Sequence, residues 1–238
     1  AALLVCAGIW AFQASNARLA QTWPDVKGEE LPVPYPLSDA EIETLRTELV
    51  ASGTDHSGQE LVPVTADDGT ETMPDPLEGA DLPAIALLRA QKRGAHLYNV
   101  RLACKECHGE NLGGRMVVDA QPVWTWYAPN ISKGGVTKDY TTADWDRIIR
   151  HGVKPDDTNA TMPAIDYQRL SDREVSDVAA FIESRPAVDT VQPPTKLGPI
   201  GKALMAFKKM PISAEMIDHS MANGALPPEM AVNAEFGE

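Results

Sequence analysis

Two of the chain's three cysteines and one of its five histidines lie within five residues, in the stretch "CKECH" at 104–108. Thiols at positions i and i+3, followed at once by an imidazole, have the spacing of covalent c-type haem attachment. Two thioether bonds would reach the two vinyl groups of one porphyrin, and the adjacent imidazole would then lie under the iron. The sequence therefore predicts one covalent haem c on Cys104 and Cys107, with His108 as the proximal iron ligand.

Other uses of this motif fit the sequence less well. A zinc site needs a second pair of ligands at suitable spacing, and no cysteine follows Cys107. A redox-active cysteine pair is typical of a βαβ context, whereas the surrounding pattern is helical. A disulfide between Cys104 and Cys107 would be strained and would leave His108 without a role.

The second axial ligand of the iron is predicted to be Met162, in "NATMPAIDY". A thioether opposite a histidine raises the reduction potential and suits reversible electron transfer, and the following proline lets a turn present the sulfur. Packing into an apolar pocket is the alternative role of Met162. Met116 is a rival that lies too close to His108 in sequence to reach the opposite face. His151 could also ligate, but it ends a predicted helix, where the dipole favours a protonated imidazole, and His96 is interpreted as a surface or packing residue.

Hydrophobic spacing predicts four helices, at residues 38–52, 82–103, 142–151 and 171–184. Ser and Glu three residues apart form predicted capping boxes at the start of the first and the last of these helices. The second helix is expected to break at Gly94. The loop between the second and third helices is rich in Gly, Pro and Trp, and no alternating strand pattern occurs. The predicted fold class is therefore all-α.

The motifs "CKECHGENLGG", "APNISKGG", "DWDRIIRHGV" and "TMPAIDYQRLSDREVSDVAAFIESRP" together resemble a class I cytochrome c domain. They are most similar to membrane-attached bacterial cytochromes with one to three such domains, and the resemblance covers about residues 85–186. It implies an all-α fold whose first and last helices cross over the haem. It also implies attachment at Cys104 and Cys107, with His108 and Met162 as axial ligands. The turn "KPDDT" departs from relatives, which tend to have a glycine after the first aspartate.

The N-terminal residues 1–12 are wholly apolar. A spanning helix needs roughly twenty apolar residues, so we interpret residues 1–23 as the outer part of a transmembrane anchor; a cleaved signal peptide is the alternative. Trp10 and Trp23 would suit membrane-interface positions. Cys6 is interpreted as a lipid-facing thiol, and its lipidation stays open.

Charge is concentrated in one segment of the chain. The net charge is −13, and residues 25–85 hold fifteen acidic side chains against two basic ones, while the remainder holds nineteen of each. Nucleic acid is therefore an unsuitable partner. We interpret residues 24–84 as an acidic, Pro-rich extension that docks on a basic partner surface; a solvated acidic loop is the alternative.

Residues 187–238 form a predicted C-terminal extension after the haem domain at 85–186. It has helical spacing around Ile200 and Phe207, and the rest should wrap over a surface. The last residues, 233–238, are interpreted as a possible link to a further haem domain, with an ordinary disordered end as the alternative.

These observations predict electron transfer by a membrane-anchored monohaem cytochrome in a respiratory or photosynthetic membrane complex. The haem domain would face the periplasm of a bacterial cytoplasmic membrane, with redox donor and acceptor proteins, other subunits and membrane lipid as partners. The chain itself would not be an enzyme. Two alternatives remain: a haem enzyme (peroxidase-like, or the cytochrome subunit of a dehydrogenase), which would need an open distal site, and a mainly structural subunit with an incidental haem.

Overall fold

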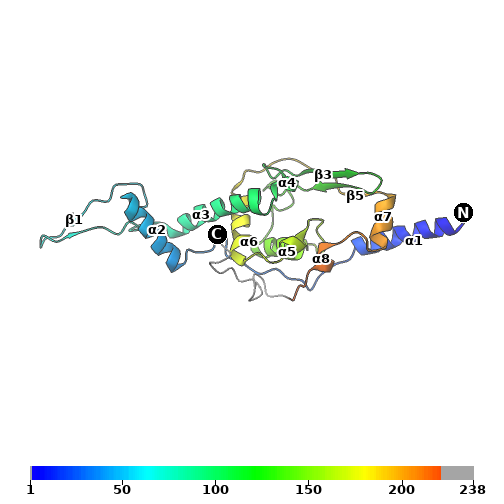
Figure 1. Ribbon diagram of the computed structural model, residues 1–238, viewed down its shortest axis with the longest axis horizontal. Helices are drawn as coiled ribbons and strands as arrows, with labels where there is room; N and C mark the ends of the chain where they lie inside the picture. Colours follow the sequence, from blue (N-terminus) through cyan, green and yellow to red (C-terminus); the bar gives the residue numbers. More distant parts are fainter. Residues whose placement is uncertain (1, 221–238) are drawn as a thin grey trace, which may run out of the picture.

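The computed structural model describes residues 2–220 (Figure 1). The helices are α1 (Ala2–Leu19), α2 (Asp39–Ser52), α3 (Leu82–His96), α4 (Lys105–His108), α5 (Thr142–His151), α6 (Asp172–Ser184), α7 (Pro199–Ala206) and α8 (Ser213–Met216). A π-helical turn η1 (Leu97–Arg101) continues α3, and a 3-10 turn η2 (Ala164–Asp166) precedes α6. The strands are β1 (Val64–Thr65), β2 (Glu71–Thr72), β3 (Arg115–Ala120), β4 (Trp124–Ala128) and β5 (Lys196–Leu197).

Helices α3 and α6 cross in close contact at the centre of the molecule (Figure 1). A Cβ built on Gly94 would lie 1.9 Å from the carbonyl oxygen of Asp177, so the two backbones touch there. The prediction of a helix break at Gly94 is wrong, because α3 continues through it to His96. The glycine instead permits the crossing, and the Arg93 guanidinium bonds the Asp177 carboxylate at 2.6 Å beside it.

The predicted helix starts are confirmed by their caps. Ser38 and Ser171 each accept a backbone N–H from the glutamate three residues on, whose carboxylate returns the bond to the serine N–H. Thr141 makes the same capping box with Asp144 at the start of α5. These reciprocal bonds satisfy backbone donors that a helix start otherwise leaves unpaired.

A three-stranded antiparallel sheet, in the order β3-β4-β5, differs from the predicted all-α chain. It occupies the Gly-, Pro- and Trp-rich segment, and β5 joins it from the C-terminal extension. The rings of Trp124 and Trp126 stack with centroids 5.4 Å apart on β4. Most side chains of the hairpin are half-buried or exposed, so the apolar and polar alternation that marks a core strand is missing.

The acidic extension has two structurally different parts. Its first part packs on the haem domain: Leu31 is buried in the main core, the Glu29 N–H donates to Asp146 at 2.8 Å, and the Ser176 hydroxyl donates to the Pro32 carbonyl at 2.6 Å. Its second part, residues 38–80, projects from the body, with β1 and β2 at the far end (Figure 1). Helix α2 has no buried residue.

Helix α1 and the C-terminal extension pack against each other at the other end of the molecule (Figure 1). Trp10 on α1 contacts Phe207 beside α7, with ring centroids 5.3 Å apart. Within residues 2–220, no helix combines the length and apolar character needed to cross a membrane. The predicted link at residues 233–238 lies outside the described residues.

Candidate haem-binding site

The sequence motif folds into a single helical turn, α4, with the adjacent Cys104 as its N-cap residue. Cys107 and His108 therefore lie within one turn of Cys104. Both thiols are free and half-buried. The backbone of Ala103 has φ 53°, a left-handed conformation, and this reverses the chain between η1 and α4.

Two tyrosines hold this turn from either end. The Tyr98 hydroxyl donates to the Gly109 carbonyl at 2.6 Å, and the Tyr167 hydroxyl donates to the Leu102 carbonyl at 3.1 Å. Burial raises the pKa of both phenols, and that of Tyr167 reaches about 12. Both therefore stay protonated and keep their donor role at neutral pH.

The imidazole of His108 is oriented by a backbone carbonyl. Its Nδ1 lies 3.0 Å from the Pro129 oxygen, and because a carbonyl can only accept, Nδ1 carries the proton. Burial lowers the pKa of His108, although the Pro129 bond opposes this shift. The ring is thus neutral, and its Nε2 has no hydrogen-bond partner among residues 2–220. A neutral imidazole held through one nitrogen, with the other free, is the usual arrangement of a histidine metal ligand.

The two thiols are not tuned as a redox pair. Burial raises the pKa of Cys104 to about 11, and it also raises the pKa of Cys107. Reactive cysteines have the opposite shift, toward the thiolate. The environment of Cys104 and Cys107 therefore disfavours dithiol redox chemistry.

Met162 lies in a tight turn between α5 and α6. The Ala164 N–H donates to the Met162 carbonyl at 2.9 Å, and Pro163 has φ −78° and ψ 59°. These angles are those of an inverse γ-turn. The Met162 side chain is half-buried, while Ala164 is fully buried and fixes the turn against the body.

The three residues weighed against Met162 as the second iron ligand lie in different environments. Met116 is 49 % exposed on β3, and His96 is exposed at the end of α3. His151 is buried with its Nδ1 3.0 Å from Nδ1 of His219. Burial and the neighbouring His219 lower the pKa of His151 to about 4, so the protonated imidazole expected from the helix dipole is not the form present at neutral pH.

Several residues of this site were not singled out from the sequence. Pro129 stands inside the quoted motif "APNISKGG", which was the available signal. Tyr98 had no sequence signal beyond helical spacing, whereas Tyr167 stands inside the quoted motif "TMPAIDYQRLSDREVSDVAAFIESRP". Trp126 differs from these residues, because the sequence already marked it, with Trp124 and Tyr127, for packing against the haem or in the core. Its indole N–H lies 3.3 Å from the hydroxyl of Thr161, the residue before Met162.

The donor set fits haem c. It comprises two free thiols on one turn and a free imidazole nitrogen beside them, and ligation by Met162 stays a prediction. Within residues 2–220, no cluster of three or more His, Cys, Asp or Glu able to hold an ion occurs.

Comparison with protein families agrees with this chemistry. The family of cbb3-type cytochrome c oxidase subunit III matches residues 89–182. The chain carries a class I c-type cytochrome domain. The matched segment runs from α3 to α6 and includes both the CxxCH turn and Met162. This cytochrome family implies covalently bound haem c, electron transfer and redox partners, and it is typically extracytoplasmic. No curated protein matches the chain.

Proposed function

We propose that this chain is a monohaem electron carrier rather than an enzyme. Cys104 and Cys107 form the thioether bonds, His108 is the proximal ligand, and Met162 is the distal ligand. The observation that carries the proposal is the α4 turn, where two free thiols adjoin a neutral imidazole with a free Nε2. Bound haem supplies a reversible one-electron couple, while the protein determines its potential, orientation and exposure.

The residues of the site have separate roles in this proposal. Pro129 fixes the plane and tautomer of His108. Tyr98 and Tyr167 hold the backbone on both sides of the attachment turn. The Met162 thioether would be the second ligand of the haem iron and would raise the potential, which would leave no open site for a substrate. Electrons enter and leave near the two half-buried cysteines.

The proposal extends to a membrane complex, respiratory or photosynthetic, with the haem domain on the periplasmic side. Residues 1–23 act as the outer part of an anchor, 24–84 as an acidic extension, 85–186 as the haem domain and 187–238 as a C-terminal extension. Exposed apolar side chains on α1 support the anchor, among them Ile9 (54 % exposed) and Trp10 (50 %). Full solubility of the mature protein without detergent would contradict it.

Met162→Ala in the haem-loaded chain tests the ligand assignment and the carrier function together. The wild type should take up one electron reversibly, show a methionine-to-iron charge-transfer band and resist added cyanide or imidazole. The variant should lose that band, bind both ligands and have a lower potential. Met116→Ala is the matched control, because it removes an exposed methionine from β3.

Two results would overturn the proposal. If Met162→Ala kept the band and the potential of the wild type, the distal ligand would be another residue. If the wild type bound cyanide readily and turned over peroxide, its distal site would be open and a haem enzyme would be the better interpretation.

A further inference from the structure

The C-terminal segment from Met205 to Ser220, called the strap below, lies across the turn that carries Met162. It is outside the matched cytochrome domain, which ends at residue 182. Helix α8 of the strap begins at Ser213 and packs on η2, directly after the Met162 turn. The Ser213 hydroxyl donates to the Met162 carbonyl at 3.0 Å.

The Met162 carbonyl thus accepts two hydrogen bonds from different directions. The Ala164 N–H donates at 2.9 Å within the turn, and the Ser213 hydroxyl donates from the strap. The first bond fixes Met162 only relative to its own neighbours. The second ties the turn to a separate part of the molecule, so it determines where the whole turn lies.

Close packing supports the same contact. Gly152, which ends α5, Ala164, Ser213 and Ala214 meet at one point. A Cβ built on Gly152 would lie 3.0 Å from the Ala164 Cβ and 3.5 Å from the Ser213 Cβ. Ala164 and Ala214 are 0 % and 1 % exposed. The turn is therefore closely packed against the strap at this point.

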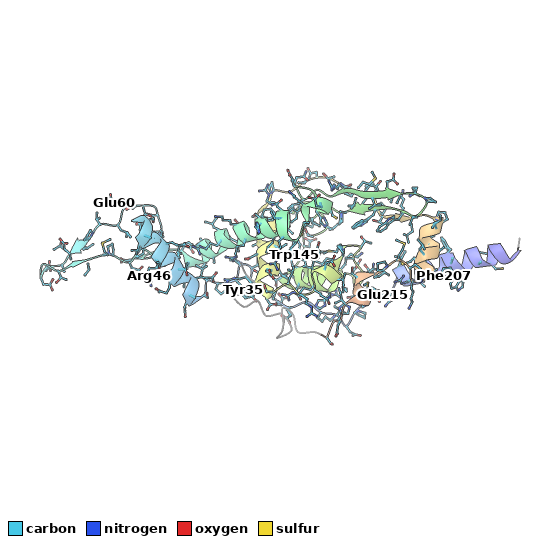
Figure 2. The ribbon with its side chains drawn as sticks, viewed as in Figure 1. Tyr35, Arg46, Glu60, Trp145, Phe207 and Glu215 are labelled. Carbon is cyan, nitrogen blue, oxygen red and sulfur yellow. The ribbon has the colours of Figure 1, made fainter. Side chains whose placement is uncertain are left out.

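The strap is itself firmly attached. Its apolar residues Met205 and Ile212 are buried in a second core cluster. Arg18, at the end of α1, donates to the Glu215 carboxylate from Nε at 2.9 Å and to the Met205 carbonyl from Nη1 at 3.0 Å. Figure 2 shows Glu215 on α8, on the side of the body that faces α1. His219 closes the strap on α5 through its 3.0 Å contact with His151.

We propose that the strap positions the sulfur of Met162, with Ser213 as the positioning residue. The inference rests on the proposed ligation of the haem iron by Met162. An axial ligand on an unsupported loop can swing away and admit another ligand, whereas a turn held from behind keeps the sulfur in place. The strength of distal ligation is thereby determined by a segment that lies outside the cytochrome domain.

Ser213→Ala and Ser213→Thr in the full, haem-loaded chain test this inference. Ser213→Ala should bind added imidazole more tightly than the wild type, by up to about tenfold, which is the effect of one hydrogen bond. It should also weaken the methionine-to-iron band and lower the potential. Ser213→Thr keeps the hydroxyl and should restore wild-type behaviour.

Ser176→Ala is the matched control. It removes a serine hydroxyl that donates to a distant backbone carbonyl, that of Pro32, at 2.6 Å. It should lower thermal stability and leave imidazole affinity, band and potential unchanged. If Ser213→Ala behaved in the same way as Ser176→Ala, the positioning role would be disproved.

Met162→Ala separates this inference from the function on which it rests. Suppose that Met162→Ala lost the methionine-to-iron band, while Ser213→Ala bound added imidazole as the wild type does. Met162 would then remain the iron ligand, and the positioning role of the strap would be overturned. Retention of the band in Met162→Ala would overturn both.

Discussion

At the scale of single residues, the burial of His151 beside His219 makes stability depend on pH. Burial and the nearby His219 lower the pKa of His151 from 6.5 to about 4. Between these values the unfolded chain binds a proton that the folded chain does not, so unfolding becomes easier as pH falls. We expect the contribution of His151 to the free energy of unfolding to be complete above pH 6.5 and to fall by at most about 3 kcal/mol by pH 4.

Chemical unfolding at a series of pH values measures this effect. His151→Gln should have a flatter pH dependence of the unfolding free energy between pH 6.5 and 4. His96→Gln, which changes an exposed histidine on α3, should keep the wild-type slope. Equal slopes in His151→Gln and the wild type would show that His151 does not carry the dependence.

At the scale of elements, the crossing of α3 and α6 depends on Gly94. Alanine there would bring its Cβ to within 1.9 Å of the Asp177 carbonyl oxygen. Neither backbone can yield without separating the helices, so we expect a loss of about 3 kcal/mol or more. Thermal or denaturant unfolding of Gly94→Ala measures it.

Gly8→Ala on α1 is the matched control for the same substitution. Nothing lies within 4 Å of a Cβ built on Gly8. Alanine should therefore be neutral there, or stabilise the helix by roughly 0.5–1 kcal/mol. If both variants were equally stable, the close approach at Gly94 would not determine the crossing.

At the scale of the whole molecule, we expect residues 53–80 of the acidic extension to be separable from the haem domain, whereas α2 is tied to it by the ion pairs of Glu41 with Arg173 and Glu48 with Arg89. The two ends of residues 53–80 lie side by side, since the His56 N–H donates to the Pro76 carbonyl at 2.9 Å and the His56 ring Nε2 lies 3.0 Å from the Glu78 oxygen. Arg46 on α2 bonds Asp75 at 3.1 Å within the projecting part of the acidic extension. Figure 2 shows Arg46 and Glu60 at this end of the molecule.

Deletion of residues 53–80 should leave the haem spectrum and potential nearly unchanged and weaken binding to the proposed partner complex. In the intact chain, raising salt from 0.1 M to 1 M should weaken the association, because the Debye length shrinks from about 10 Å to about 3 Å. Co-purification with partner subunits measures both effects. A deleted chain whose haem domain no longer folded would contradict the docking role.

The deletion variant must keep residues 24–37, because they pack on the haem domain. Leu31 is 6 % exposed within the main core, and the Glu29 and Pro32 backbones bond α5 and α6. Composition alone grouped these residues with the acidic segment. Leu31, Val33, Tyr35 and Leu37 in fact alternate with prolines, and the first three pack on the main core. A count of charges and prolines did not use this spacing.

The sequence by itself determined the local features of this protein. Capping boxes start α2 and α6, and the CxxCH spacing marks Cys104, Cys107 and His108, because both depend on residues a few positions apart. Only the tertiary structure decided what depends on distant contacts. Gly94 permits a helix crossing, β5 completes a sheet from the C-terminal extension, and Ser213 reaches Met162 from 51 residues away. No short-range pattern encodes such contacts, since each requires the chain to fold back on itself.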